Sequence, residues 1–486
     1  MKTLARALSA AALLVATAAI PQVVGAQPPP SPAMPKADPT LPAFKALYKE
    51  LVETNTTASV GSCTLAAQRM AARMKAAGFP DSDLTVFIPP EFPKSGGLVA
   101  VYPGTDPKAK AVLLLAHLDV VEAKREDWTR DPFTLVEEGG YFYARGAMDD
   151  KAQASIWVDS LIRFKHEGYK PRRTVKMALT CGEEGGGPLN GASWLVKNKR
   201  ELIDAAFALN EGAGGQLTED GAKRIAHTVE AGEKTSQSFV LEVTNPGGHS
   251  SRPVPDNAIY RLADAIEKVR RYEFPVMIND ANKAYLMGMS KIEGGQRGAA
   301  MTALAANPKD AAADKLLSAD PSLHTLLRTT CVATMISGGH AQNALPQRVT
   351  VTINCRIFPG VSREAIRDKL MEIIGDPQVK ISQVASGREG EAPAPPLTAN
   401  VMGPIEKVSA QMWPGVPVIP ILQAGATDGK ALTAGGIPTY GVSGLFLEPD
   451  LGRIHGLNER LGVQSLYEGR EFLYRLVKVY ADTPGA

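Results

Sequence analysis

Helical and strand patterns alternate over residues 42–208. Ala66, Met70 and Met74 recur at every fourth position, which is typical of the buried face of a helix. Residues 112–116 form a continuous apolar run, as strands do when both of their faces are buried in a parallel sheet. Because strands alternate with helices here, the pattern predicts an α/β domain with a mainly parallel, mixed sheet.

The pattern changes near Thr235. Apolar residues alternate over 239–243, helix patterns follow at 259–266 and 362–374, and strand patterns lie at 349–355 and 379–384. Together these segments predict a smaller α+β domain in which two helices cover one face of a sheet. Within it, residues 279–327 show no strand periodicity, so this stretch is either an insertion with its own helices or a functional loop.

Strand patterns of the first kind resume after a linker rich in glycine, proline and charged residues at 386–396. The second domain is therefore expected to be inserted into the first. The predicted boundaries are 41–233 and 389–486 for the two parts of the first domain, and 234–388 for the inserted domain.

Residues 1–26 have the pattern of a secretory signal peptide. Two basic residues precede an uncharged apolar run, and small residues end at Ala26, where a signal peptidase could cleave. A membrane anchor is the alternative, although the run is short for a span of about 20 apolar residues and Pro21 interrupts it. A proline-rich leader follows at 27–40. The pattern predicts an exported protein, periplasmic or secreted.

The charge balance excludes two kinds of partner. Without Lys2 and Arg6, 51 basic side chains stand against 51 acidic ones. This balance gives no support for nucleic-acid binding or for a basic membrane-binding patch. No second apolar run is long enough to span a bilayer, so no membrane span is expected in the mature chain.

The four cysteines form no CxxC pair, so a zinc site built from thiolates is not expected. Buried free thiols are the expectation for all four. A disulfide between Cys331 and Cys355 is the alternative, because both lie on strand patterns that could be neighbours in a hairpin and an exported protein can form disulfides.

Candidate metal ligands follow the strand patterns of the first domain. His117 ends the 112–116 run, and on an extended chain His117 and Asp119 point the same way. A carboxylate beside a metal-bound imidazole fixes its tautomer, and α/β folds place their sites at the carboxyl ends of parallel strands. By itself, however, this pair fits a structural histidine better.

Further acidic residues occupy comparable positions. Asp149 and Asp150 directly precede a helix pattern, which Asp150 could simply cap. Glu183 and Glu184 follow another strand inside a glycine-rich segment that a solvated acidic pair would not need. Glu211 follows the next strand, and His455 lies in a turn far downstream. Two histidines and three carboxylates are the ligand set of a zinc pair with one bridging carboxylate, with cobalt or manganese as substitutes.

Taken in order, the motifs HxD, GxxDDK, GEEGG, a glutamate after the next strand, GGHSSRP and HGxNE resemble the di-zinc metallopeptidase family of aminoacylase, glutamate carboxypeptidase and succinyl-diaminopimelate desuccinylase. The resemblance runs from residue 44 to the C-terminus, and its specificity lies in the order of the motifs. The long insertion is most similar to the carboxypeptidase S-like branch. The family implies a zinc-peptidase-like catalytic domain with an inserted α+β lid domain.

The resemblance also implies two Zn²⁺ per chain. Asp149 would bridge the ions, and the other ligands would be His117 and Glu211 at one ion and Glu184 and His455 at the other. Asp119 would orient His117. Glu183 would be the general base, which takes a proton from metal-bound water and passes it to the leaving amine. The peptide bond between Asp149 and Asp150 would be cis.

In the lid, His249 of the GGHSSRP motif would donate a hydrogen bond to the developing oxyanion. Asn343 and Arg356 match positions that bind the substrate carboxylate, for which the planar guanidinium fork is suited; a plain surface charge is the alternative for Arg356. Relatives often dimerise through the lid, so a homodimer is expected unless the insertion blocks that face. His227 is expected to be an ordinary surface residue.

These features predict a zinc-dependent hydrolase that cleaves an amide or peptide bond adjacent to a free carboxylate, as a carboxypeptidase, aminoacylase or dipeptidase does. The substrate would be a small peptide or an N-acyl amino acid, and metal-bound water would be the nucleophile. A catalytically inactive, metal-containing binding protein is the alternative, and the presence of every expected group argues against it.

Overall fold

The structure is a computed structural model that describes residues 38–185, 189–385 and 391–484. The chain divides into two compact units, Met1–Pro42 and Ala43–Ala486. In the first unit, the described residues form a turn in which Asp38 accepts hydrogen bonds from the backbone and the hydroxyl of Thr40. The predicted signal peptide at 1–26 and most of the leader at 27–40 lie outside the described residues.

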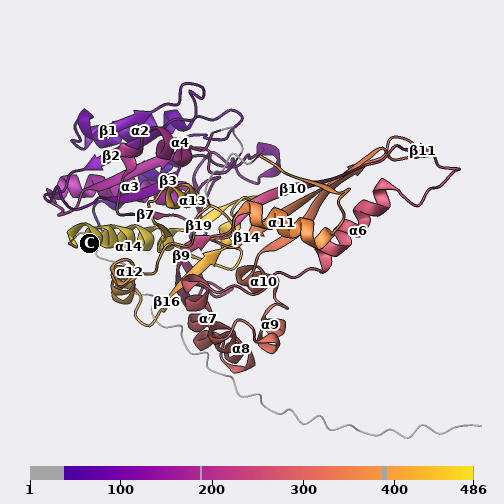
Figure 1. The fold of residues 1–486 in the computed structure, drawn as a ribbon. Coiled ribbons are helices and arrows are strands. Elements are labelled where there is room, and N and C mark those ends of the chain that lie inside the picture. Colours follow the sequence, from indigo (N-terminus) through magenta and orange to yellow (C-terminus); the bar gives the residue numbers. More distant parts are fainter. Residues whose placement is uncertain (1–37, 186–188, 386–390, 485–486) are drawn as a thin grey trace, which may run out of the picture. The chain divides into compact units, whose positions relative to one another are not determined.

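A large mixed sheet is the frame of the second unit (Figure 1). Within the described chain it has ten strands, in the order β1 (Leu84–Phe87), β2 (Gly97–Tyr102), β6 (Val175–Thr180), β3 (Val112–His117), β7 (Phe207–Asn210), β17 (Thr439–Gly441), β9 (Arg224–Glu233), β8 (Gly215–Leu217) and β18 (Phe446–Leu447), with β16 (Val418–Gln423) paired to β9. Strand β3 runs parallel to both β6 and β7, whereas β2 runs antiparallel to β6. The predicted α/β class with a mixed sheet is confirmed.

Helices cover both faces of this sheet. One set is α1 (Leu41–Val52), α2 (Cys63–Ala76), α3 (Lys151–Glu167), α12 (Ala399–Met412) and α14 (Val463–Asp482), and the other is α4 (Gly191–Asn198), α5 (Arg200–Ile203) and α13 (Gly429–Ala434). Side chains of β3 enter the two cores alternately, with Val112 and Leu114 in the first core and Leu113 and Leu115 in the second. Burial on both faces explains the continuous apolar run in the sequence.

A second, antiparallel sheet is formed by the chain between β9 and β16. Its strands lie in the order β12 (Thr330–Gly338), β14 (Arg348–Ile357), β10 (Thr235–Thr244) and β15 (Lys380–Gln383). Helices α6 (Ala258–Arg271) and α11 (Arg363–Ile374) pack against it, with Leu262 and Leu370 in a shared core (Figure 1). The expected sheet with two helices is present, and the domain boundaries drawn from the sequence stay a prediction.

The stretch without strand periodicity is helical. It contains α7 (Asp280–Glu293), α8 (Gly295–Ala306), α9 (Ala311–Leu317) and α10 (Pro321–Leu327), which enclose their own apolar core. The side chains of Asn279, Asp310 and Asp320 cap α7, α9 and α10 by accepting hydrogen bonds from first-turn backbone groups. Of the two alternatives for this stretch, the insertion with its own helices is the one found.

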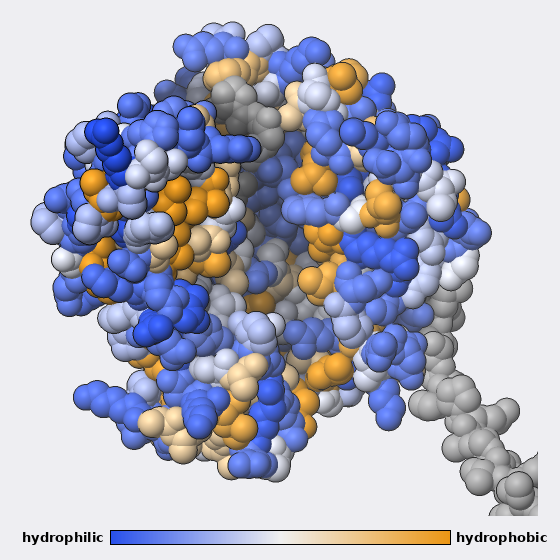
Figure 2. All heavy atoms as spheres, turned by 90° about the vertical axis from the view of Figure 1, so that its right-hand side faces the viewer, coloured by the Kyte–Doolittle hydropathy of each residue, from blue (hydrophilic) through white to orange (hydrophobic). Residues whose placement is uncertain are grey.

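The remaining strands of the described residues form two small sheets. One contains β4 (Val136–Glu138), β5 (Tyr141–Tyr143) and β19 (Arg460–Gly462), and the other contains β11 (Gly248–His249) and β13 (Ala344–Leu345). No helix of the described residues is long and apolar enough to cross a membrane. On the face seen in Figure 2, hydrophobic residues form separate patches among hydrophilic ones, and the face is hollowed near its centre.

The described residues include all four cysteines, and all four are paired, so the expectation of buried free thiols is wrong. Cys331 and Cys355 form the alternative bridge, because the register of β12 and β14 places them directly opposite each other. The second disulfide joins Cys63, the first residue of α2, to Cys181 just after β6, across a separation of 118 residues. Packing of α2 on the sheet brings these two together, which no local pattern could reveal.

Candidate active site

The expected metal ligands meet at one edge of the large sheet. His117 is the last residue of β3, Glu184 follows β6, and Glu211 comes directly after β7. Because β3 runs parallel to both β6 and β7, the carboxyl ends of these strands meet at this edge. Asp149 comes from the turn before α3, and His455 from the turn before β19. Five residues that are far apart in the sequence thus reach one place.

Asp149 lies between the two histidines. Its Oδ1 is 3.0 Å from Nε2 of His117, and its Oδ2 is 3.2 Å from Nε2 of His455. Glu211 Oε1 lies 3.5 Å from the same His117 nitrogen, and Glu184 Oε2 lies 2.8 Å from the same His455 nitrogen. Each imidazole therefore faces the shared Asp149 and one further carboxylate, which is the donor arrangement for two ions with a bridging carboxylate.

The charges of this cluster fit a cationic group. Burial raises the pKa of Glu211, and the nearby Asp149 carboxylate acts in the same direction. Hydrogen bonds to Asp149 and Glu184 raise the pKa of His455 to about 10. Ligand atoms of His117, Asp149 and Glu184 all lie within 4.8 Å of one another. Crowded carboxylates beside imidazoles form a donor set whose negative charge a bound metal ion would neutralise.

The peptide bond between Asp149 and Asp150 is cis, as the resemblance implies. Asp150 stands at the N-cap position of α3, but its side chain makes no capping hydrogen bond. Its Oδ2 instead accepts a hydrogen bond of 3.2 Å from the backbone N–H of His117. The simple capping role considered for Asp150 is therefore wrong, and its carboxylate joins the turn before α3 to the end of β3.

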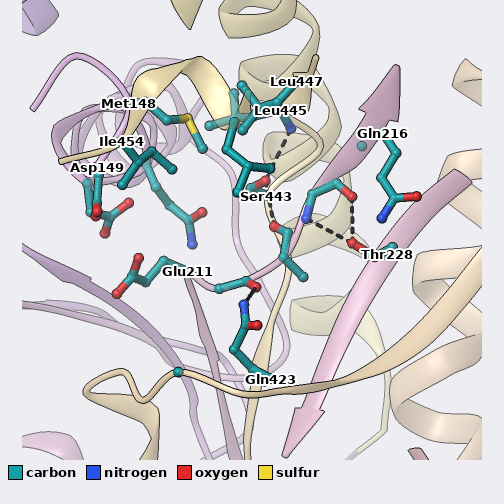
Figure 3. Close-up of a pocket in the computed structure, with 18 of the residues that line it drawn as sticks. Met148, Asp149, Glu211, Gln216, Thr228, Gln423, Ser443, Leu445, Leu447 and Ile454 are labelled. Atoms are coloured by element: carbon teal, nitrogen blue, oxygen red, sulfur yellow. Dashed lines mark hydrogen bonds between the residues drawn. The ribbon is translucent and has the colours of Figure 1, made fainter. Parts of the chain in front are cut away.

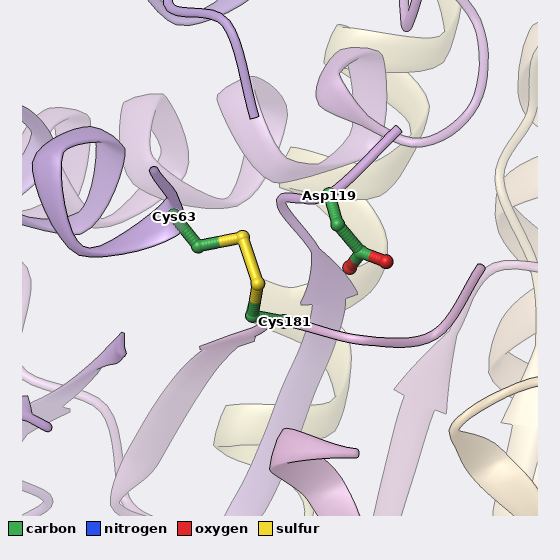
Figure 4. Close-up of side chains that lie close together, drawn as sticks. All are labelled: Cys63, Asp119 and Cys181. Atoms are coloured by element: carbon green, nitrogen blue, oxygen red, sulfur yellow. A yellow bond between two sulfur atoms is a disulfide. The ribbon is translucent and has the colours of Figure 1, made fainter. Parts of the chain in front are cut away.

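Asp119 connects His117 to the loop that carries Glu183 and Glu184. Its Oδ1 is 3.6 Å from Nδ1 of His117, and its backbone carbonyl is closer to that nitrogen, at 3.0 Å. The carboxylate also accepts hydrogen bonds from the backbone of Glu183 at 3.3 Å and of Glu184 at 3.0 Å. The disulfide of Cys181 lies beside it (Figure 4). The expected orienting residue is thus also an anchor for the two glutamates.

Glu459 is a site residue to which the sequence reasoning gave no role. It is fully buried, and its Oε1 accepts backbone hydrogen bonds from Met148 at 2.8 Å and Asp149 at 3.1 Å. Its Oε2 accepts a hydrogen bond of 2.7 Å from the guanidinium of Arg145. The available signal was its place in the HGxNE motif, four residues after His455.

The three expected lid residues do not line the pocket that the described residues form beside the ligands. His249 is exposed in β11, and its Nδ1 is 2.8 Å from the hydroxyl of Ser251. The backbone of Asn343 accepts a hydrogen bond from Ser250, so Asn343 lies next to the strand pair β11–β13 that contains His249. Arg356 is half-buried in β14. The structure brings His249 and Asn343 together, and the roles of all three stay predictions.

His227 is completely buried in β9, so the expectation of a surface residue is wrong. Its ring packs against Trp413 and Phe472, and its Nδ1 is 2.7 Å from the hydroxyl of Ser409. Burial lowers the pKa of His227 to about 3. It is therefore a neutral residue of the core.

A pocket of about 750 Å³ opens beside the metal ligands (Figure 3). Asp149, Glu183, Glu211 and His455 lie on its wall. Small-molecule sites in proteins have volumes of about 300–1,000 Å³. The candidate ligands and the candidate base therefore share one cavity with room for a substrate.

The fold and this site are those of a hydrolase of the peptidase class. The family model described as "Peptidase family M20/M25/M40" matches residues 113–479, which is more than half of the chain. The chain therefore belongs to this family, and the resemblance drawn from the ordered motifs is confirmed.

Individual relatives agree with this assignment. The "Probable carboxypeptidase S-like 2" of Dictyostelium discoideum is 30% identical over 389 residues, which cover 78% of this chain and 74% of that protein. The human "N-fatty-acyl-amino acid synthase/hydrolase PM20D1" is 26% identical over 417 residues, 83% of this chain and 81% of that protein. Among solved structures, the M20 family metallo-carboxypeptidase Sso-CP2 from Sulfolobus solfataricus has a TM-score of 0.66 and 18% identity, covering 90% of this chain and 99% of that one. The last likeness is one of fold.

Proposed function

We propose that the protein is a two-zinc hydrolase that cleaves an amide or peptide bond next to a free carboxylate. The position of Asp149 carries this proposal, because each of its carboxylate oxygens faces a different histidine. Each histidine also has a second carboxylate beside it. Imidazole and carboxylate donors favour zinc, and cobalt or manganese can replace it.

Two carboxylates that are not expected to bind the ions, Glu183 and Asp119, would divide the work around them. Zinc bound here would polarise the scissile carbonyl and lower the pKa of a bound water to about 7. Glu183, buried on the pocket wall, would take the proton of that water and deliver it to the leaving amine. Asp119 would hold His117 and, through its backbone hydrogen bonds, keep Glu183 and Glu184 in place.

The three expected lid residues would contact the substrate rather than the metal ions. Arg356 and Asn343 would bind the free carboxylate of the substrate, and His249 would donate to the developing oxyanion. His249 lies in β11, and Asn343 directly precedes β13, the strand that pairs with β11, so the two would reach the substrate together. Because none of the three lines the pocket within the described structure, the proposal requires the lid to close before the chemical step.

The names of the relatives support the substrate class. One is named a probable carboxypeptidase S-like protein and another an N-fatty-acyl-amino acid synthase/hydrolase. Carboxypeptidase, aminoacylase and dipeptidase activity all fit a substrate with a free carboxylate beside the cleaved bond. A metal-containing binding protein without activity is the second candidate, and it lacks a supporting observation in the described structure. Glu183 lies on the pocket wall together with Asp149, Glu211 and His455, which supports the hydrolase instead.

Export and pairing with a second copy belong to the same proposal. The pattern of residues 1–26 supports export to the periplasm or beyond, where the two disulfides would persist. Strand β12 is an edge of the second sheet and exposes Val332, Met335 and Ile336. An apolar edge strand of this kind supports a homodimer through the lid.

A panel of dipeptides and N-acyl amino acids, each with its C-terminal amide as a matched partner, tests the proposal on the zinc-loaded protein. At least one acid should be cleaved, and its amide should react at least about 30-fold more slowly. The reason is that an arginine without its carboxylate costs about 2–5 kcal/mol. Equal rates on acid and amide would remove the carboxylate from the proposal. Hydrolysis of no member would refute the hydrolase.

A further inference from the structure

The Cys63–Cys181 disulfide lies next to the candidate active site. Cys181 directly follows β6, and the segment after it, residues 182–185, carries Glu183 and Glu184 and is called the glutamate loop below. Both sulfur atoms and a carboxylate oxygen of Asp119 lie within 4.8 Å of one another (Figure 4). Asp119 in turn accepts the backbone hydrogen bonds of Glu183 and Glu184. The disulfide is therefore beside both the chain that carries the two glutamates and the carboxylate that holds them.

The other end of the disulfide is fixed in the frame of the domain. Cys63 is the first residue of α2 and is buried. The next residue, Thr64, is buried as well, and its hydroxyl donates a hydrogen bond of 2.7 Å to the carbonyl of Pro93. The same hydroxyl accepts one of 2.8 Å from the backbone of Gly96, just before β2. The disulfide thus ties the chain at the end of β6 to a point that is itself held in place.

The glutamate loop has no regular structure of its own. Its residues belong to no helix or strand, and Gly182 has a φ of 91°, so the chain turns sharply as it leaves β6. The carbonyl of Cys181 accepts a hydrogen bond of 2.7 Å from the backbone of Gly191, the first residue of α4. Side chains on a loop are placed less precisely than those on helices and strands, and depend on the contacts that support them. The disulfide is one of these supports.

The disulfide is also a suitable neighbour for the Asp119 carboxylate. Asp119 is buried, and its oxygens face the ring of His117 and accept from the glutamate loop. A disulfide sulfur has no hydrogen to donate, so it does not compete for these oxygens. Two thiols in the same place would each bring an S–H group, which is a weak donor. The closed disulfide therefore leaves the carboxylate to His117 and the loop.

The second disulfide has no comparable position. Cys331 and Cys355 lie directly opposite each other in β12 and β14, which are paired over most of their length. Backbone hydrogen bonds hold such strands together without a covalent link. None of the five expected metal ligands lies on either strand. The Cys331–Cys355 bridge is therefore an internal control for the effect of losing a disulfide.

We propose that the Cys63–Cys181 disulfide positions the glutamate loop, and that the enzyme reaches its full rate only when this disulfide is closed. The proposal rests on the proposed function, which makes Glu183 the base and Glu184 a ligand. With the bridge open, the loop would lose its link to α2, and Glu183 would lie at a less defined distance from the water that it deprotonates. Because neither cysteine would touch the substrate, both are positioning residues. An exported chain would gain its activity outside the cytosol, where disulfides form.

Hydrogen exchange in the metal-free protein tests the positioning by itself. In the Cys63→Ala/Cys181→Ala variant, the backbone amides of Glu183 and Glu184 should exchange at least about tenfold faster than in the wild type, because the untethered loop opens locally. Amides of β3, which report global unfolding, are the internal reference. The Cys331→Ala/Cys355→Ala variant should leave the two rates within about threefold. Unchanged rates in the first variant would mean that Asp119 holds the loop unaided, and would overturn the proposal.

Closing the disulfide in one and the same chain tests its effect on the chemistry. The Cys331→Ala/Cys355→Ala protein is produced with its two remaining thiols reduced and is then treated with oxidised glutathione. The two cysteine sulfurs become joined, and their hydrogens leave on two molecules of reduced glutathione, which are removed before zinc is added. At saturating zinc, kcat on the fastest substrate of the panel should rise about 10–100-fold on closure, because a misplacement of about 1 Å costs about a hundredfold in rate.

The Michaelis constant separates positioning from general damage. KM should change less than about threefold between the open and closed forms, because the groups proposed to bind the substrate carboxylate lie elsewhere. A disulfide that closes, as mass spectrometry of the linked peptides shows, without a change in kcat would overturn the proposal. So would a rise in kcat that is matched by a fall in KM. If the reduced protein does not fold, the kcat of Cys63→Ala/Cys181→Ala relative to the wild type decides in the same way.

Failure of this proposal can be told apart from failure of the proposed function. If the zinc-loaded protein with both disulfides closed cleaves no member of the panel, the proposed function is wrong, and hydrogen exchange still reports on the loop. If it cleaves a member at the same kcat with the Cys63–Cys181 bridge open or closed, the proposed function stands and the positioning role is wrong.

Discussion

Glu459 Oε1 lies 3.1 Å from the backbone nitrogen of Asp149 and accepts its hydrogen bond. Glu459 belongs to the segment that carries His455, and Asp149 belongs to the turn before α3. One buried carboxylate therefore joins the two segments, and its second oxygen pairs with Arg145 at 2.7 Å. The position of the proposed bridging ligand depends on a residue that would not touch the metal.

Replacing Glu459 with glutamine should weaken metal binding without removing a ligand. The new amide group would present an N–H toward the backbone or guanidinium donors, so the turn that carries Asp149 should loosen. Loss of such an outer partner lowers metal affinity about 10–100-fold. Competition with a chromogenic chelator measures the affinity, and Glu201→Gln on the surface is the control. Unchanged affinity in Glu459→Gln would show that Asp149 holds its position unaided.

The neighbours Glu183 and Glu184 should separate in function. Glu183→Gln should lower kcat about a hundred- to ten-thousandfold, as removal of a general base does, while both metal ions stay bound. Glu184→Gln should lose metal as well as activity, because its carboxylate is the one beside His455. Elemental analysis and single-turnover kinetics distinguish the two effects. More than a few per cent of the original activity in Glu183→Gln would mean that the base is another residue.

The two disulfides should contribute unequally to stability. Loss of the Cys63–Cys181 bridge should lower the free energy of unfolding by about 1.4 kcal/mol more than loss of the Cys331–Cys355 bridge, because it closes the longer loop. Double serine variants of each pair, unfolded in urea in the metal-free state, give the comparison. A larger loss from the shorter loop would contradict the chain-entropy explanation.

Because the pKa of His227 is low in the folded protein, we expect the protein to lose stability in acid. This pKa is about 3 in the folded protein against an ordinary value of 6.5, so between these values the unfolded chain holds a proton that the folded chain does not. The free energy of unfolding therefore rises with pH over this window. The stability that the neutral His227 contributes is lost as the pH falls from 6.5 toward 3.

His227→Phe keeps the aromatic packing and removes the titration. From pH 7 to pH 4, the wild-type protein should lose about 3 kcal/mol more than this variant. Metal-free samples of both proteins, unfolded in urea at the two pH values, give this difference. The same loss in both proteins would mean that His227 does not enter the core in its neutral form.

Local patterns predicted the elements that are local by nature. The run that became β3 is apolar at every position because both of its faces are buried, and alternation identified β10 and β14. The bridge between Cys331 and Cys355 could be considered because it joins neighbouring strands. The ordered motifs predicted which four residues would gather around Asp149.

Other parts of the site depend on contacts between distant segments. Glu459 accepts hydrogen bonds from backbone N–H groups. Every residue except proline has such a group, so the sequence does not show which of them Glu459 binds. Cys63 meets Cys181 only because α2 packs on the sheet. The pocket beside the metal ligands is lined by Ile225 and Leu445, which lie more than 200 residues apart in the sequence. Its wall therefore forms only when the fold is complete.

The central claim is that Asp149 bridges two ions, and anomalous scattering from zinc-loaded crystals, recorded at the zinc edge, tests it most directly. Two peaks about 3.5–4 Å apart should lie on either side of the Asp149 carboxylate. One should be in contact with His117 and Glu211, and the other with His455 and Glu184. A single peak, or two peaks that share a ligand other than Asp149, would contradict the account.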